Sequence, residues 1–173
     1  MAIKSSGSSL AFSEIETEFG SNSSRSLGDY RISQSVGTLT KTLDTGIPSS
    51  GPIKFSEFYG KRLNVVVNFH TGGAESRQNA KSRYNGNSVT VIGGFRGKKE
   101  AGSKILIHVN KTIGSSKGNQ SIVALRTGNW NSDVVLSVDI GSSGGLYGAG
   151  GDGGKGADSW SDGGSSNASS GGN

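Results

Sequence analysis

The chain has 173 residues, a formal net charge of +5, no cysteine and 30 glycines, and only 31% of its residues are hydrophobic. The absence of cysteine excludes a disulfide framework, thiol chemistry and any zinc site built on cysteine. The N-terminus has no signal-peptide apolar core and no apolar run reaches membrane-spanning length, so we expect a soluble chain made in a cytoplasm and not exported by a classical leader.

Two short helical signals open the chain. The stretch FSEIETEFG predicts a helix over residues 12–20, with Ser13 and Glu16 as a capping-box pair and Gly20 as its end. Its apolar side chains recur on one face: Phe12, Ile15 and Phe19. The stretch SLGDY predicts a second, shorter helix capped by Ser26, with Asp29 three residues later.

The remainder of the first sixty residues contains one more helix signal. Residues 31–43 are rich in Ser and Thr and suggest a short extended piece, and IPSSGP then marks a break. FSEFYGKR follows at residues 55–62, with Ser56 as the expected cap. Three short helices with aromatic ends predict a docking module over residues 1–60, because helices of this length are not stable alone and must bury their apolar faces.

Residues 61–141 show the period-2 alternation of half-buried strands. The expected strands lie at 63–69, 89–91, 105–109, 122–125 and 134–140, separated by turn-rich stretches. Five such strands with polar loops predict a mainly β fold, an antiparallel β-sandwich of jelly-roll type. Its core would be small, so we expect oligomerisation or packing on a neighbouring subunit.

The basic charge is concentrated in this middle part of the chain. Residues 61–140 contain twelve basic and four acidic residues, a surplus of eight. We interpret the surplus as a solvated face of a small β domain, because no nucleic-acid-binding motif accompanies it. A nucleic-acid groove remains an alternative, since a basic surface gains affinity by counterion release.

The final segment, residues 142–173, is rich in glycine and serine. Gly145, Gly148, Gly151 and Gly154 fall at every third residue, and a second phase carries Gly150, Gly153 and Gly156. Because three residues per turn is the period of a polyproline-II helix, this spacing predicts a polyglycine element whose backbone packs closely on its neighbours. The composition is also compatible with a disordered tail.

Three other interpretations of the glycine run have less support, and we expect no metal and no cofactor. Residues 153–161 match one calcium-binding nonapeptide, but that ion lies between successive repeats and a single repeat cannot build a site. GAGGDGG contains G-x-G-x-x-G without the strand and helix that a phosphate cradle needs. A collagen triple helix would need a longer G-X-Y repeat and proline.

No catalytic constellation stands out, and we expect the protein not to be an enzyme. His70 and His108 occupy strand positions opposite the apolar face, without a serine elbow, an H-E-x-x-H motif or a convincing carboxylate pair. Aromatic side chains outside the core could instead contact a sugar or receptor, above all in the loops 71–87 and 127–132. The candidate receptor-binding residues are Tyr84, Trp130, Tyr147 and Trp160.

The motifs of the first segment, in their order, resemble an N-terminal module found on structural and tail-tip proteins of tailed bacteriophages. The three matching stretches are SSLAFSEIETEFG, SLGDY and IPSSGPIKFSEFYG. The glycine-rich end, with SGGLYGAGGDGG, loosely resembles the glycine tracts of phage tail-tip adhesins. The resemblance implies a virion protein whose N-terminal module binds other tail or baseplate proteins and whose distal end faces the host.

The sequence therefore predicts a non-enzymatic tail-fibre or tail-tip component with three parts: an anchoring module (1–60), a β-sandwich (61–141) and a glycine-rich distal segment (142–173). The residues expected to anchor it are Phe12, Ile15, Phe19, Tyr30, Phe55, Phe58 and Tyr59. A homo-oligomer is expected, with a trimer as one candidate. The alternatives are a carbohydrate- or receptor-binding module acting through the β-domain loops and a nucleic-acid-binding protein using the basic middle.

Overall fold

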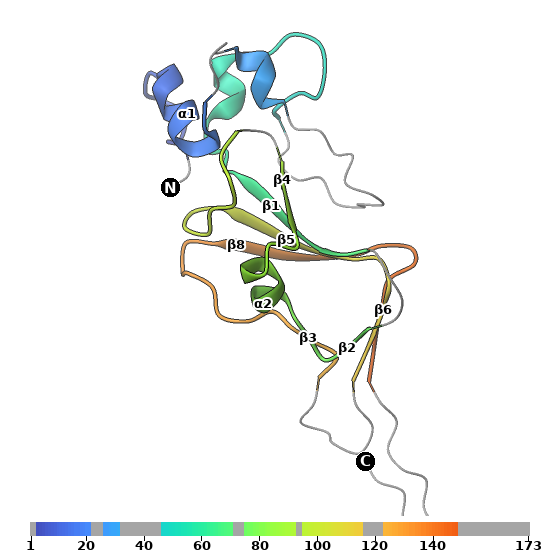
Figure 1. The fold of residues 1–173 in the computed structure, drawn as a ribbon. Helices are drawn as coiled ribbons and strands as arrows, with labels where there is room; N and C mark the ends of the chain where they lie inside the picture. The colour runs from blue at the N-terminus through green and yellow to red at the C-terminus, as the bar shows by residue number, and fades with distance from the viewer. Residues whose placement is uncertain are drawn as a thin grey trace, which may run out of the picture.

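Three stretches of the chain run in the same direction and lie side by side as parallel strands (Figure 1). The computed structural model describes residues 3–21, 26–31, 46–70, 75–92, 95–115 and 123–148. The largest sheet has the order β4-β1-β5-β8, in which β1, β5 and β8 are parallel and β4 is antiparallel to β1. Its strands are β1 (Asn64–Phe69), β4 (Val89–Ile92), β5 (Lys104–Val109) and β8 (Val135–Ile140).

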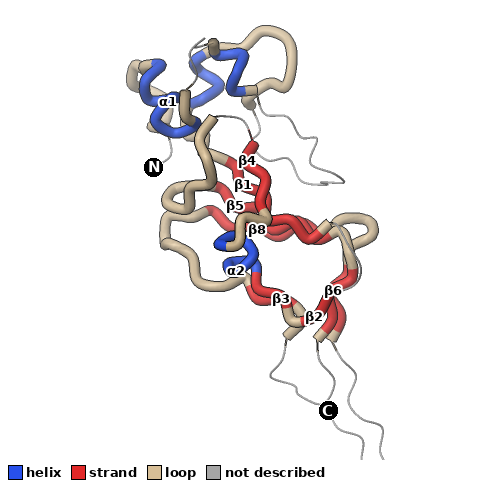
Figure 2. Tube along the Cα trace, in the orientation of Figure 1, coloured by secondary structure: helices blue, strands red, loops and turns tan. Residues whose placement is uncertain are grey.

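Two smaller parallel sheets continue the same three stretches of chain. One consists of β2 (Glu75–Ser76), β6 (Thr112–Gly114) and β9 (Gly145–Tyr147), and the other of β3 (Gln78–Asn79) and β7 (Leu125–Arg126). The successive passes are thus β1-β2-β3, β5-β6-β7 and β8-β9, and Figure 2 shows the main sheet meeting the sheet of β2 and β6 at a corner. Passes stacked in this way have the arrangement of coils in a β-solenoid, where each coil contacts only its neighbours.

The expected antiparallel sandwich is therefore wrong. The protein is mixed α/β, with mostly parallel sheets and a few short helices. The alternation of apolar and polar residues is the same in parallel and antiparallel strands, so it could not report strand direction. Parallel neighbours need long crossover connections. Strands were expected at 89–91 and 122–125 in the segments between β1, β5 and β8, and the structure adds β2, β3, α2 (Ala80–Asn85) and β6 there.

The parallel register stacks apolar side chains from three strands on one face of the main sheet. The aligned triplets are Val65–Ile105–Leu136, Val67–Ile107–Val138 and Phe69–Val109–Ile140. Helix α2 (Ala80–Asn85) packs on this face, with Ala80 and Tyr84 buried and the Arg83 guanidinium 4.4 Å from the centre of the Phe69 ring. The sequence analysis missed α2 and treated its residues as part of a loop. Its cap is Asn79, whose side-chain oxygen accepts from the Ser82 N–H at 3.0 Å.

The first two predicted helices are present, as α1 (Phe12–Phe19) and the 3₁₀ helix η1 (Leu27–Tyr30). Helix α1 ends at Gly20 as predicted, but its cap is different. The Glu14 carboxylate accepts from the Ala11 N–H at 2.8 Å, so the helix begins one residue before Ser13. In η1 the predicted cap is confirmed, because Ser26 Oγ accepts from the Gly28 N–H and Asp29 accepts from the Ser26 N–H, both at 3.1 Å.

The third predicted helix is the 3₁₀ helix η2 (Phe55–Phe58), and its predicted cap is also wrong. Glu57 accepts from the Lys54 N–H at 2.6 Å, which places the helix start before Ser56. In both α1 and η2 the third helical residue is a glutamate, and its carboxylate accepts a hydrogen bond from the backbone N–H of the residue just before the helix. The serine on which each prediction depended is exposed and already helical.

Four of the five predicted strands match β1, β4, β5 and β8 within a residue or two. The fifth, expected at 122–125, is only the two-residue strand β7. The glycine-rich segment begins with a strand, β9, although a polyglycine or disordered element was expected from residue 142. The rest of that segment, residues 149–173, and the extended piece at 32–43 lie outside the described residues.

Two glycines are required by the corner between β8 and β9. A Cβ at Gly144 would collide with the Val109 carbonyl oxygen, and one at Gly141 would collide with the Asn110 side chain. The Gly141 N–H donates to the Val109 carbonyl at 2.8 Å, and the Gly145 N–H donates to that of Lys111 at 3.2 Å. At this corner, glycine allows the last pass to approach the backbone of the pass before it.

Candidate functional site

The three helical motifs of the first sixty residues contribute to one aromatic cluster. The Tyr30 ring lies at its centre, with centroid distances of 6.3 Å to Phe58, 6.1 Å to Phe19 and 5.9 Å to Phe12. Phe12 in turn lies 6.1 Å from Phe55, edge to face. Most of these contacts have the edge-to-face geometry that aromatic rings prefer. Residues separated by more than forty positions in the sequence thus form one packing unit.

The seven predicted anchoring residues divide by exposure. Four are fully buried within this chain: Ile15, Phe19, Tyr30 and Phe58. Phe12 and Tyr59 are partly buried, and only Phe55, with 40% of its surface exposed, is open to solvent. The sequence analysis expected these side chains to pack on each other and on a partner. In the structure four of them are fully buried by contacts within this chain. The surface that a partner could reach therefore consists of Phe55 and the partly buried Phe12 and Tyr59.

The module is joined to the strands by a buried carboxylate and by its last helical carbonyl. Glu18 is buried and accepts from the Leu63 N–H at 2.8 Å and from Lys99 Nζ at 2.7 Å. The Phe19 carbonyl accepts from the N–H groups of Phe95 and Arg96 at 2.7 and 2.8 Å. One hydrophobic core therefore includes side chains of both the module and the sheet.

Two of the candidate receptor-binding aromatics pack on each other. Tyr84 is buried, with its ring 5.2 Å from that of Trp130 and edge to face with it, and burial raises the pKa of the Tyr84 hydroxyl. The Trp130 indole N–H donates to the Thr127 carbonyl at 2.9 Å, and Lys81 Nζ lies 4.6 Å from its ring centre. Trp130 therefore covers α2, and one ring face is occupied by a cation.

An ion pair holds the same loop against α2. Glu100 accepts from Lys81 Nζ, and its other carboxylate oxygen accepts from the Asn131 N–H at 2.9 Å. The hydrogen bond from Lys81 lowers the pKa of Glu100, and that from Asn131 lowers it further. Since α2, the chain before β5 and the chain after Trp130 meet at this carboxylate, the loop 127–132 has a defined position.

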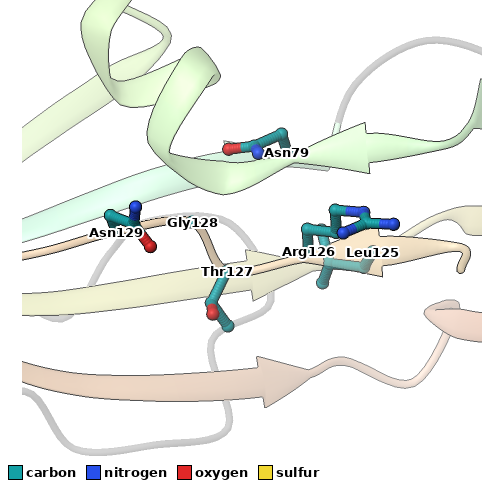
Figure 3. A pocket seen from close by; sticks show the side chains of 6 residues that line it. All are labelled: Asn79, Leu125, Arg126, Thr127, Gly128 and Asn129. Carbon is teal, nitrogen blue, oxygen red and sulfur yellow. The ribbon is translucent and has the colours of Figure 1, made fainter.

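A pocket of about 560 Å³ opens beside this loop (Figure 3). Figure 3 shows Asn79 at the end of β3 on one side, and Thr127 and Asn129 on the chain that follows β7. The lining residues are Asn79, Leu125, Arg126, Thr127, Gly128 and Asn129. Gly128 has φ of +89°, and a Cβ there would collide with the Lys81 side chain. Amide, hydroxyl and guanidinium groups in one pocket suit a ligand rich in hydroxyl groups, such as a sugar.

The loop 127–132, where the sequence predicted receptor contacts, thus lies next to a pocket. The residues just before Trp130 line this pocket, whereas Trp130 is not among its lining residues. Asn79, Thr127 and Asn129 lie within the two loops expected to contact a receptor but were not among the predicted site residues, and Arg126 lies just outside them. The TGN triplet before Trp130 was the available signal, and Asn79 joins it only because β3 and β7 pair. Tyr147 on β9 is 59% exposed, far more open than Tyr84, and Trp160 lies outside the described residues.

The two histidines lie together in the structure. His108 and Asp139 are paired in the register of β5 and β8, are almost completely buried, and form a hydrogen bond of 2.9 Å between Nδ1 and Oδ2. The His70 ring lies 5.8 Å from that of His108. Burial lowers the pKa of His70, and the neighbouring His108, Lys111 and Arg83 side chains lower it further. Because a catalytic imidazole must reach its substrate, the enclosure of His108 favours a structural role.

The basic residues of the middle segment are largely engaged within the chain. The ion pairs join Lys81 to Glu100, Lys99 to Glu18, and both Arg83 and Lys111 to Glu75. Arg62, Arg96 and Lys98 donate to backbone carbonyls. These lysine and arginine side chains bind carboxylates and carbonyls of the same chain and come from several elements. A nucleic-acid groove would instead need basic side chains gathered along one surface.

Across the described ranges, no group of three or more potential ligands could hold a metal ion, and no helix is long and apolar enough to cross a membrane. Comparisons with protein-family models, with curated proteins and with solved structures found no match.

Proposed function

We propose that this chain is a non-enzymatic structural component of a bacteriophage tail, a tail-fibre or tail-tip protein held by its N-terminal module and contributing to host attachment. The resemblance of the three N-terminal motifs to the phage module is the starting point. In this proposal the protein acts by binding, with other tail or baseplate proteins at one end and the host surface at the other.

The observation that carries the proposal is the folding of all three motifs into one unit at one end of the molecule. Helix α1 and the two 3₁₀ helices lie at the end where the chain begins, and β9 points toward the opposite end (Figure 1). An adaptor between a particle and a distant surface needs two separated ends of this kind. The aromatic cluster leaves Phe55 at its rim, in contact with Phe12 but 40% exposed, and an exposed aromatic side chain of this kind suits a protein interface.

Substitution of Phe55 tests the anchoring role. We expect phage carrying Phe55→Ala to assemble particles that lack this protein, with at least about a tenfold loss of incorporation, because a central aromatic contact typically contributes 2 kcal/mol or more to binding. The measurement is quantitative mass spectrometry of purified particles, together with the melting temperature of the isolated variant. Because Phe55 is exposed, that temperature should change little.

The matched control is Tyr147→Ala, an exposed aromatic side chain on β9 at the other end of the molecule. Particles with this variant should retain the protein, and any defect should appear as slower adsorption to host cells. Normal incorporation of a folded Phe55→Ala protein would contradict anchoring through this surface. Absence of the wild-type protein from purified particles would contradict the proposed function as a whole.

A second candidate function is carbohydrate or receptor recognition, favoured by the pocket beside the loop 127–132. It is compatible with the first, because an attachment protein must contact the host. The Arg126 guanidinium offers several donors to hydroxyl or carboxylate groups. Asn129 and Thr127 add donors and acceptors around the same opening.

Glycan-array binding by the purified full chain tests this candidate. We expect Arg126→Ala to weaken binding about tenfold, in line with a net 1.5 kcal/mol for one hydrogen bond to a charged group. Arg77→Ala is the matched control, because Arg77 is an exposed arginine outside the pocket and should bind as wild type does. Equal weakening by both variants would indicate nonspecific charge attraction and would count against a ligand in the pocket.

A further inference from the structure

Two imidazole rings lie side by side where β1 and β5 end. His70 directly follows β1 and His108 lies in β5, and their ring centroids are 5.8 Å apart. His108 has no exposed surface, and His70 is partly buried. The chain contains no other histidine and no cysteine. Any imidazole chemistry of this protein therefore takes place here.

Each ring has a buried nitrogen without a hydrogen-bond partner in the part of the chain that the structure describes, namely Nδ1 of His70 and Nε2 of His108. On His108 the other nitrogen, Nδ1, bonds to the Asp139 carboxylate at 2.9 Å. Because an ionised carboxylate can only accept, Nδ1 carries the proton, and Nε2 of the neutral ring presents a lone pair. A buried lone pair of this kind requires either a donor or a metal ion.

A third buried polar atom lies on the same face of the sheet. Asn68 is the register partner of His108 and comes two residues before His70, so the alternation of side chains places it on their face. Its amide nitrogen donates to Thr90 Oγ1 at 2.9 Å. The amide oxygen Oδ1 is buried and has no partner among the described residues. Two imidazole nitrogens and an amide oxygen thus lie together with nothing bound to them.

The spacing of the rings fits two imidazoles that bind one ion. Zinc–nitrogen bonds of about 2.0–2.1 Å place each ring centre about 3.2 Å from the ion. The two ring centres are then about 5.2 Å apart at the tetrahedral angle and at most about 6.4 Å apart. The observed 5.8 Å lies between these values, so the rings are close enough for one ion to bind both.

The charges around the two rings balance. Arg83 and Lys111 are the cations near His70, and both are ion-paired to Glu75, at 2.9 and 2.5 Å. Asp139 adds a second carboxylate at the other ring. Two cations and two carboxylates leave no excess positive charge there to repel a metal ion.

We propose that His70 and His108 together bind one divalent transition-metal ion of the kind that imidazole suits, such as Zn²⁺ or Cu²⁺. The ligand atoms are Nδ1 of His70 and Nε2 of His108, and water fills the remaining positions. Asn68 Oδ1 accepts a hydrogen bond from such a water. Asp139 holds His108 in its metal-binding tautomer, as carboxylates behind metal-bound histidines commonly do. The site needs only two protein ligands, which agrees with the absence of any group of three acidic or histidine side chains in the described ranges.

The bound ion ties β1 to β5 near the corner where the main sheet meets the sheet of β2 and β6 (Figure 2). Metal binding of this kind contributes directly to folding stability, in a chain that has no disulfide. Sequence analysis predicted no metal, because the two histidines are far apart in the chain and meet only when β1 and β5 pair. The site goes beyond the proposed function, since it can be measured on the purified full-length chain whether or not it belongs to a virion.

Thermal unfolding of the untagged full-length chain with added Zn²⁺ tests the site. At a hundred times the dissociation constant, we expect Zn²⁺ to raise the melting temperature by about 5–10 °C relative to the chelator-treated chain. His70→Ala should raise the dissociation constant at least about a hundredfold, because losing a ligand costs more than losing a residue behind it. The matched control is Asp133→Ala, which removes an exposed carboxylate away from the two rings and should bind Zn²⁺ as wild type does.

Nuclear magnetic resonance of the imidazole rings separates a built site from a surface ion, because the chain has only two histidines. We expect one equivalent of Zn²⁺ to shift the signals of both rings. Movement of one ring alone would indicate an adventitious ion only, held by the more exposed histidine, and would overturn the proposal. This measurement uses the wild-type protein, so it decides even if circular dichroism shows that His70→Ala does not fold.

Two further results would overturn the proposal. One is a melting temperature that millimolar Zn²⁺ leaves unchanged. The other is a folded His70→Ala protein that binds Zn²⁺ as tightly as wild type, or a loss of affinity in Asp133→Ala equal to that in His70→Ala, since either would place the bound ion elsewhere.

Discussion

The variant Phe58→Ala should lose about 3–5 kcal/mol of folding stability, the usual cost of removing a fully buried phenylalanine ring. Phe58 has no exposed surface and packs 6.3 Å from both Phe19 and Tyr30, measured between ring centroids. Its removal leaves a cavity beside the buried Phe19 and Tyr30 rings. Urea unfolding of the purified chain, followed by tryptophan fluorescence and circular dichroism, measures the loss.

Phe55→Ala is the matched control for this prediction, because it removes the same side chain from an exposed position of the same 3₁₀ helix. We expect it to cost less than about 1 kcal/mol, as surface substitutions usually do. The two variants also separate folding from anchoring: particles should lose both proteins, but only Phe58→Ala should be unstable in isolation. A Phe58→Ala protein as stable as Phe55→Ala would show that the aromatic cluster is not part of the core.

Asp139→Ala should also destabilise the fold by about 3–5 kcal/mol, the typical effect of removing one partner from a buried pair. The substitution leaves His108 fully buried without the carboxylate that accepts from its Nδ1 side at 2.9 Å. This bond connects β5 to β8, so the last strand of the main sheet loses a buried polar contact with its neighbour. Thermal and urea unfolding at pH 7 would measure the change.

Two controls accompany this variant. Asp139→Asn keeps a side-chain oxygen that can accept the hydrogen bond, so we expect it to retain part of the lost stability. Asp133→Ala removes a carboxylate from an exposed position shortly before β8 and should alter stability by less than about 0.5 kcal/mol. Equal stability of Asp139→Ala and wild type would contradict a structural role for the pair.

Secondary structure was predicted well from the sequence where apolar residues recur at a regular period. The apolar residues at alternate positions of NVVVNF, KILIHV and VLSVDI predicted β1, β5 and β8, although the structure buries β1 and β5 on both faces. The three short N-terminal helices were also predicted. Two of their caps were assigned to serine although glutamate provides the contact, an error of one or two residues that depends on local backbone geometry.

The candidate sites were less predictable, because they depend on contacts between distant segments. Tyr84 and Trp130 were both expected in loops, but Tyr84 lies in α2, and their mutual packing follows from the position of that helix, which no strong periodic signal marked. The pairing of His108 with Asp139 could be found only by someone who already knew that β5 and β8 are parallel and in register.

The sequence by itself determined the strands β1, β4, β5 and β8, the three short N-terminal helices and which side chains are apolar, since these follow from local periodicity and composition. Strand direction, the corners between sheets and the assembly of three N-terminal motifs into one cluster were decided only by the tertiary structure. The physical reason is that a strand has the same two-residue period whichever way its neighbour runs. Direction is set by the connections, and therefore by how the whole chain returns to bury the faces of β1, β5 and β8.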